Sequence, residues 1–222
     1  MWKRAFDVVL SFIGLVLTGP FLLALAVWIK LDSKGPVFYR GVRVGRFGRP
    51  FRIFKFRSMV ADADKIGPSS TADEDPRVTR PGRLIRKGKL DELSQLLNVL
   101  IGDMSLVGPR PEVQKFVDMY TDEEKAILDA RPGITDWASI WNADEGAVLA
   151  GADDPDQAYL ELIRPTKLKL QLDYVRHHNL LTDIRIILYT IRKVLRRTWV
   201  PKRLRAYPYP GAPGAAAGQD PA

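Results

Sequence analysis

The sequence contains no cysteine among its 222 residues. This absence excludes a disulfide framework, a thiolate metal site and a cysteine nucleophile. Histidine is almost as scarce, since the only two, His177 and His178, are adjacent. The sequence therefore argues against a histidine-based metal site or catalytic triad. We expect both histidines at the surface of a helix end.

Acidic residues are also in deficit. The chain has 34 basic and 26 acidic residues, which gives a net charge of +8. Residues 34–59 contain eight basic residues and no acidic one. Such a balance suits an anionic partner: nucleic acid, anionic lipid or a phosphate-bearing substrate. The length suits one domain with short appendages.

Residues 8–29 form one uncharged, mostly apolar stretch with Gly19-Pro20 near its middle. A helix of about 22 residues could just span a hydrocarbon core of about 30 Å. Pro20 removes a backbone donor, so we expect a bend there. Basic residues flank both ends, and basic flanks prefer the cytoplasmic side. This pattern favours a re-entrant hairpin, which enters and leaves the membrane by the same face. A kinked spanning helix, a cleaved signal peptide and a buried core helix are the alternatives.

The rest of the chain predicts a mostly helical α/β domain with a small β-hairpin. Two strands, residues 37–40 and 51–57, frame a loop rich in glycine and proline. The alternation of the second strand slips at Ile53-Phe54, which indicates a bulge. Residues 61–80 are polar and predict a mobile loop.

From residue 90 to 101, apolar residues recur at the spacing of a helix with one buried face. That face comprises Leu93, Leu96, Leu97, Leu100 and Ile101. Further helical patterns cover residues 113–120, 122–130, 166–177 and 182–197, while residues 142–158 predict a loop. The last of these helices is basic and amphipathic, so it suits either a membrane surface or packing on the core.

Asp91 and Glu92 begin the helix of residues 90–101. Acidic residues are common in the first turn of a helix because they complement its dipole. The functional alternative is that a carboxylate attacks phosphorus and forms an acyl phosphate. That reaction needs cations or Mg²⁺ to neutralise the phosphate. Arg86, Arg110 and Lys55 have the required charge.

Arg110 lies between Pro109 and Pro111. The two prolines restrict the backbone, so the guanidinium is held with little freedom to lose. Arginine also suits bidentate phosphate binding. A purely structural turn arginine is the alternative.

Several runs of residues carry a resemblance. They are Lys3-Arg4-x-Phe6-Asp7, Lys30-Leu31-Asp32-Ser33-x-Gly35-Pro36-Val37-Phe38-Tyr39, Lys55-Phe56-Arg57-Ser58-Met59, Leu90-Asp91-Glu92-Leu93-x-Gln95-Leu96-x-Asn98-Val99-Leu100-x-Gly102-Asp103-Met104-Ser105-x-Val107-Gly108-Pro109-Arg110-Pro111 and Arg131-Pro132-Gly133-Ile134-Thr135. From about residue 3 to 197, the chain resembles the bacterial sugar transferases, the monotopic polyprenyl-phosphate phosphoglycosyl transferases.

The resemblance implies transfer of a sugar 1-phosphate from a UDP-sugar to a polyprenyl phosphate such as undecaprenyl phosphate, with release of UMP. It also implies Mg²⁺, a re-entrant helix and the cytoplasmic face of the bacterial inner membrane. Asp91 would be the nucleophile and would contact the metal, and Glu92 would assist it. Arg86 and Arg110 would hold phosphates, and Lys55 is a further candidate for that role.

The expected organisation is a membrane hairpin at residues 1–34, a small catalytic domain at 35–200 and a disordered tail rich in Pro, Gly and Ala at 201–222. The fold would be monotopic, with amphipathic helices at the membrane interface, and would lack the extra membrane helices of larger relatives. The resemblance implies a role in glycan, exopolysaccharide or glycoprotein assembly, at its first membrane step. The oligomeric state stays open, a homodimer included.

The chain departs from the family pattern in three places. Gly19-Pro20 replaces a frequent Ser-Pro at the bend, and Ser94 replaces a frequent proline. Residues 136–145 carry acidic residues where Gly-Trp-Ala-Gln-Val-Asn-Gly-Arg is common. This last difference leaves the nucleotide and sugar contacts of that segment open.

A non-catalytic membrane-surface scaffold is the rival function, and a basic nucleic-acid binder is a weaker one.

Overall fold

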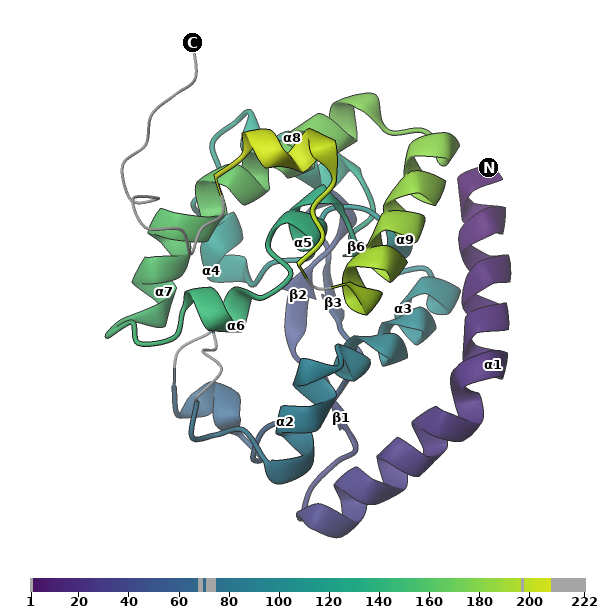
Figure 1. The fold of residues 1–222 in the computed structure, drawn as a ribbon, viewed down its shortest axis with the longest axis vertical. Coiled ribbons are helices and arrows are strands. Elements are labelled where there is room, and N and C mark those ends of the chain that lie inside the picture. Colours follow the sequence, from purple (N-terminus) through teal and green to yellow (C-terminus); the bar gives the residue numbers. More distant parts are fainter. Residues whose placement is uncertain (1, 68–69, 71–74, 197, 209–222) are drawn as a thin grey trace.

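The computed structural model describes residues 2–67, 70, 75–196 and 198–208. The described α-helices are α1 Trp2–Asp32, α2 Arg80–Lys87, α3 Leu96–Ile101, α4 Gln114–Val117, α5 Trp137–Trp141, α6 Glu145–Val148, α7 Pro155–Ala158, α8 Arg164–His177 and α9 Leu180–Leu195. The strands are β1 Phe38–Tyr39, β2 Val42–Val44, β3 Pro50–Arg52, β4 Lys55–Phe56, β5 Ser105–Val107 and β6 Gly133–Thr135. The expectation of a mostly helical fold is confirmed (Figure 1).

The predicted hairpin is divided into two short ladders. β1 pairs with β4 and β2 pairs with β3, both antiparallel. The slip in alternation at Ile53 falls in the gap between β3 and β4, so it marks a break between ladders and the predicted bulge is wrong. The side chain of Asn98 takes over the backbone groups there. Its Nδ2 donates to the Arg52 carbonyl (3.0 Å) and its Oδ1 accepts from the Phe54 amide (2.7 Å).

β5 and β6 form a parallel pair that the sequence did not reveal. The pair requires Gly108 and Gly133, whose backbones lie against each other. A Cβ on Gly108 would lie 2.3 Å from the carbonyl oxygen of Arg131, and one on Gly133 would lie 2.1 Å from the Gly108 nitrogen. These two glycines therefore fix the turn that follows β5 against the start of β6.

The predicted helix of residues 90–101 is a 3-10 helix, Leu90–Gln95, followed by α3. Its buried face is polar, so the prediction of a buried apolar face is wrong. The buried residues are Asp91, Ser94, Gln95, Asn98 and Val99. The leucines are half-buried and Ile101 is 63% exposed. The physical reason is that the leucine side packs against α1, where a Cβ on Gly14 would touch the Leu96 side chain at 3.2 Å.

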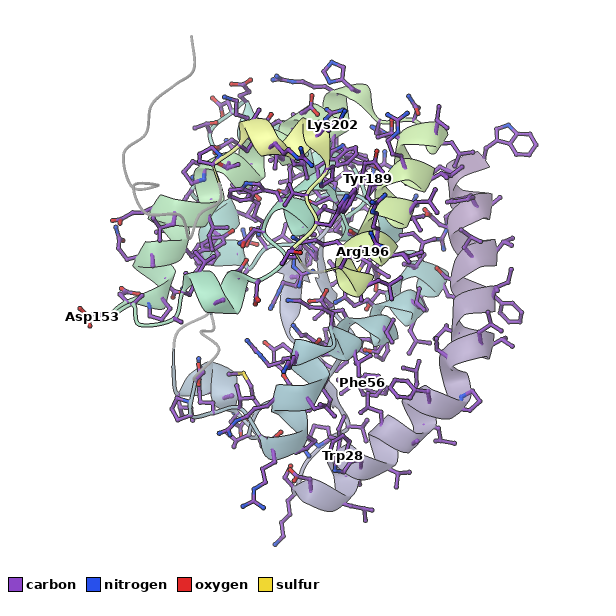
Figure 2. All side chains as sticks on the ribbon, viewed as in Figure 1. Trp28, Phe56, Asp153, Tyr189, Arg196 and Lys202 are labelled. Carbon is purple, nitrogen blue, oxygen red and sulfur yellow. The ribbon has the colours of Figure 1, made fainter. Side chains whose placement is uncertain are left out.

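α1 is one long apolar helix with Pro20 inside it. It bends near its middle and lies along one side of the domain (Figure 1). Only four of its described residues are buried, Asp7, Ser11, Leu25 and Ile29, and most of its large apolar side chains are exposed. Figure 2 shows Phe56 between the second half of α1 and α2. There it packs in an apolar cluster with Leu25, Ile29 and Ile85.

Polar contacts tie the first half of α1 to the domain. Lys3 Nζ lies 2.6 Å from Asp183 Oδ2, and Arg4 donates to the Val99 carbonyl at 2.6 Å. Asp7 is 2% exposed and accepts from the Ser105 hydroxyl at 2.8 Å. The Lys-Arg-x-x-Asp run thus anchors the start of α1 to α3, β5 and α9.

Arg57 ties the other end of α1 to the same domain. It is 5% exposed, and its guanidinium donates to the carbonyls of Ile29 (3.2 Å), Ser33 (2.8 Å) and Lys34 (2.6 Å). These carbonyls lie at or beyond the last turn of α1, where intrahelical partners run out. Both ends of α1 are therefore held by one body.

The largest apolar cluster lies among α5, α8, α9 and the strand β5, with Trp137, Tyr174 and Ile186 at its centre. The two closing helices are confirmed as α8 and α9, and both histidines are exposed at the end of α8 as expected. The prediction of a loop at 142–158 is partly wrong, since it contains α6 and α7.

Two other predicted segments have more structure than expected where they are described. Residues 63–65 form a 3-10 turn, but residues 68–69 and 71–74 of the predicted mobile loop lie outside the described residues. The segment after residue 200 begins with a 3-10 helix, Lys202–Ala206, whose Leu204 is buried in the main core. Residues 209–222 of the predicted tail also lie outside the described part of the chain.

Candidate active site

One open cleft of about 2390 Å³ runs through the domain. Its lining includes Lys55, Arg86, Asp91, Glu92 and Arg110, the five residues that the sequence singled out. They come from β4, α2, the 3-10 helix of residues 90–95 and the turn after β5. The fold therefore brings together charged groups that are up to 55 positions apart in the sequence.

Asp91 lies at the start of the 3-10 helix and is 3% exposed. Lys55 Nζ is 3.0 Å from Asp91 Oδ2 and 3.6 Å from Glu92 Oε1. The other oxygen of Asp91, Oδ1, is buried and has no hydrogen-bond partner among the described residues. A carboxylate with one paired and one unpaired oxygen can bind a further group through the unpaired oxygen.

Glu92 is paired with Arg110. One guanidinium nitrogen of Arg110 donates to Glu92 Oε2 at 2.9 Å, and the other donates to Oε1. Burial opposes ionisation of Glu92, but the positive charges of Arg110 and Lys55 outweigh it and hold the pKa of Glu92 well below its ordinary value. Glu92 in turn raises the pKa of Arg110. Both groups are therefore ionised at neutral pH.

Asp136 fixes the backbone that carries Arg110. It is fully buried, and its Oδ2 accepts from the Arg110 amide (3.2 Å) and from Gln171 Nε2 (2.9 Å). Its Oδ1 caps α5 by accepting from the Ser139 amide at 2.6 Å. Sequence reasoning missed this role, although an aspartate directly before the mostly apolar segment Trp137–Trp141 is an N-cap signal.

A second buried group supports the same turn. Glu112 accepts from Lys167 Nζ and from the Tyr159 hydroxyl, and Lys167 also lies 3.0 Å from that hydroxyl. Burial opposes the charge on Glu112, but Lys167 lowers the pKa of Glu112 nonetheless. No signal in the sequence pairs these residues, because 55 positions separate Glu112 from Lys167.

Arg86 stands apart from the paired charges. It lines the cleft from α2, is half-buried and forms no ion pair within 4 Å among the residues that the structure describes. Its charge is therefore available to an anion in the cleft. Arg86 thus lines the same cleft as the paired groups of Lys55, Asp91, Glu92 and Arg110.

The cleft changes character along its length. Near α1 and α9 its walls are apolar, and they include Leu10, Ile13, Leu96, Ile187 and Ile191. Asp144 and Glu145 line another wall, and the charge of Glu145 acts on Arg110. One opening therefore joins a charged centre to the apolar helix α1.

No group of three or more acidic or histidine side chains that could hold a metal ion occurs among the described residues. Mg²⁺ sites in phosphate-processing proteins often use only one or two carboxylates together with substrate phosphates. The unpaired Oδ1 of Asp91 is suited to such a site.

Comparison with known proteins assigns the chain to a family. Residues 1–197 match the model of the bacterial sugar transferases. The chain is 41% identical over 198 residues to a UDP-N-acetylgalactosamine-undecaprenyl-phosphate N-acetylgalactosaminephosphotransferase of Aeromonas hydrophila, covering 87% of this chain and 43% of that protein. It is 37% identical over 197 residues to a UDP-glucose:undecaprenyl-phosphate glucose-1-phosphate transferase of Escherichia coli K12, covering 86% and 39%.

A third relative is closer in length. The chain is 36% identical over 193 residues to the uncharacterized sugar transferase EpsL of Bacillus subtilis, and the match covers 87% of both proteins. By contrast, it spans less than half of the Aeromonas and Escherichia relatives. The match over residues 1–197 includes α1 and every charged residue that lines the cleft. This chain belongs to the bacterial sugar transferase family.

Proposed function

We propose that this protein transfers a sugar 1-phosphate from a UDP-sugar to a polyprenyl phosphate and releases UMP. The observation that carries the proposal is the environment of Asp91. It is a buried carboxylate with one oxygen paired to Lys55 and one unpaired, in a cleft that also holds Arg86 and Arg110. The names of the Aeromonas and Escherichia relatives support the same donor and acceptor classes.

The reaction has two steps with Asp91 as nucleophile. In the first, an oxygen of Asp91 bonds to the phosphorus that carries the sugar. The bond from that phosphorus to the bridging oxygen of the diphosphate breaks, and UMP leaves with the electron pair. In the second, an oxygen of the polyprenyl phosphate attacks the same phosphorus. The bond to Asp91 breaks, and the carboxylate is restored.

Cations make the attack of one anion on another feasible. Arg86 lines the cleft and forms no ion pair within 4 Å among the described residues, so it can bind a phosphate directly. Arg110 is bound to Glu92, which orients the guanidinium while its remaining N–H groups stay available. Lys55 contacts both carboxylates, which suits it to hold the Asp91 side chain in place for the attack. Glu92 assists by holding these two cations in place.

Mg²⁺ is part of the proposal. Asp91 would hold it through the oxygen that has no protein partner, together with oxygens of the diphosphate. When bound, the ion would neutralise charge on the transferred phosphoryl group.

The two ends of α1 support a proposal for the membrane arrangement. Lys3, Arg4 and Asp7 hold one end to the domain, and Arg57 holds the other. A straight spanning helix would place its ends about 30 Å apart on opposite faces of the membrane. We infer that α1 is re-entrant and that the domain lies on the cytoplasmic face of the bacterial inner membrane. The apolar end of the cleft then opens towards the acyl chains, where a polyprenyl tail resides.

A non-catalytic scaffold is the competing function. It would need the apolar surface of α1 and the basic surface, but it would not need a buried Asp91 beside three cations. The gathering of Lys55, Arg86, Asp91 and Arg110 in one cleft favours catalysis. The exopolysaccharide production protein ExoY is a further relative, and its name supports a place in polysaccharide assembly.

The test is nucleotide release by the detergent-purified protein with Mg²⁺, a polyprenyl phosphate and a panel of UDP-sugars. UMP from at least one donor, absent with the variant Asp91→Asn, is the expected result. Release of UDP would indicate ordinary glycosyl transfer and would contradict the proposal. Absence of release with every donor would favour the scaffold.

A further inference from the structure

Gln95 is a buried residue whose side chain has no hydrogen-bond partner among the described residues. It is 1% exposed, and both Oε1 and Nε2 are buried and unbonded. The side chain also borders the cleft. Buried amides are almost always hydrogen-bonded, and an unbonded one lowers the stability of the fold. The Gln95 amide therefore requires a partner that none of the described residues provides.

Poor packing does not explain this observation, because Ser94 and Asn98 on the same polar face are bonded. Ser94 donates to the Phe54 carbonyl at 3.1 Å. Asn98 bonds the backbone on both sides of Ile53. Gln95 lies between these two anchored residues, so the helix is held on both sides of an amide that has no bonded partner among the described residues.

The position of Gln95 connects it with Asp91. Gln95 follows Asp91 by four positions in the 3-10 helix Leu90–Gln95, and both residues border the same cleft. Asp91 Oδ1 is likewise buried and unbonded. Three unpaired polar atoms, two acceptors and one donor, therefore occur within this one short helix. A ligand that binds there needs both a hydrogen-bond acceptor and a hydrogen-bond donor.

We propose that Gln95 binds the sugar phosphate while Asp91 carries it, an inference that rests on the function proposed above. Nε2 donates to a non-bridging phosphoryl oxygen, and Oε1 accepts from a hydroxyl group of the sugar. A sugar phosphate presents both kinds of group within a few ångströms. The neutral amide binds the phosphoryl oxygen without forming an ion pair, so it does not compete with Lys55 for Asp91.

Gln95→Met separates this role from a structural one. Methionine has a similar length and volume but no strong hydrogen-bonding group. If the amide serves only the ligand, its removal leaves Tm unchanged or raises it, because an unbonded buried amide is replaced by an apolar group. The same change slows formation of the sugar-phosphate adduct by roughly ten- to a hundredfold, as expected for one hydrogen bond to a charged group.

Gln171→Met is the matched control for stability. Gln171 is also fully buried, but its Nε2 donates to Asp136 at 2.9 Å. Its replacement breaks a bond inside the protein and is expected to lower Tm.

Gln95→Glu is the second variant of the site. It keeps the shape but places a carboxylate where the donor was, so adduct formation is expected to be slower than in Gln95→Met.

The experiment measures Tm and the rate of adduct formation, by intact mass, with a UDP-sugar that the wild type accepts. Slow adduct formation at unchanged or raised Tm supports the proposal. An unchanged rate in Gln95→Met overturns it. So does a slow rate with a Tm as low as that of Gln171→Met, which indicates a structural role. If the wild type forms no adduct with any UDP-sugar, the proposed function itself fails, and the role of Gln95 fails with it.

Discussion

The guanidinium of Arg110 donates one hydrogen bond to each carboxylate oxygen of Glu92. This pair joins the turn after β5 to the 3-10 helix that carries Asp91. Lys55 bridges Asp91 and Glu92 from β4. Arg110, Glu92, Lys55 and Asp91 therefore form one connected network, so a change in any of them is expected to act on the nucleophile as well as on its own partner.

Arg110→Lys keeps the positive charge but removes the planar fork that pairs with Glu92. We expect transition-state binding to weaken by about 1.5–3 kcal/mol, the loss of a hydrogen bond between charged groups. Steady-state kinetics with varied UDP-sugar would show this as a fall in kcat/KM of about ten- to a hundredfold. Equal kinetics for the wild type and Arg110→Lys would give Arg110 a structural role only.

Glu112→Gln is expected to destabilise the fold by about 3–5 kcal/mol at pH 7, because it leaves Lys167 charged and buried without its partner. The pKa of Glu112 is lowered in the folded protein, so its contribution is fully present above the ordinary glutamate pKa of about 4.3. It is lost as the pH falls through the lower folded value.

The difference in Tm between the wild type and Glu112→Gln should therefore be constant at neutral pH and shrink below about pH 4.3. Thermal unfolding at several pH values measures it. The double variant Glu112→Gln with Lys167→Met, which removes the stranded charge, is the control and should recover part of the lost stability. A difference that grows towards acid pH would contradict this account of the pair.

Arg57→Met is expected to release the second end of α1 from the domain. It removes the hydrogen bonds to the carbonyls of Ile29, Ser33 and Lys34, at a cost of about 1–3 kcal/mol. Protease cleavage near residue 34 and a lower Tm would report the change. Arg43→Met, at a half-buried position of β2 where the guanidinium donates to the neighbouring Val42 carbonyl, is the control. Equal protease cleavage and equal Tm in the two variants would contradict the anchoring role of Arg57.

The absence of native cysteine allows a direct test of the topology. Single cysteines at Trp2 and Lys34, both exposed positions at opposite ends of α1, can be probed with a membrane-impermeant maleimide. A re-entrant helix predicts protection of both positions in intact cells and labelling of both in inverted vesicles. Labelling of position 2 alone in intact cells would indicate a helix that spans the membrane.

The residues of the charged cleft could be predicted because the family motifs are local in sequence. Lys55, Arg86, Asp91, Glu92 and Arg110 all line it. The helical periodicity also predicted α8 and α9 correctly. What the sequence could not provide were groups that act through long-range contacts. Asp136 supports Arg110 from 26 positions away, and Lys167 neutralises Glu112 from 55 positions away.

The helix of residues 90–101 shows a different limit. Its leucine pattern predicts a buried apolar face, which is correct for a helix in a water-soluble domain. Here the leucines lie towards α1, and the polar side faces the cleft and the β4 strand. Ser94 and Asn98 satisfy backbone groups there. Periodicity alone locates the two faces but does not tell which of them is buried.

The most direct test of the central claim is the mass of the protein after incubation with a UDP-sugar and Mg²⁺ in the absence of any polyprenyl phosphate. The account predicts about one equivalent of UMP and a protein heavier by one sugar phosphate, with the added mass on the peptide that contains Asp91. The adduct should disappear, with formation of the polyprenyl diphosphate sugar, when the acceptor is added. UMP that forms only in the presence of acceptor, with no adduct at any time, would contradict Asp91 as the nucleophile.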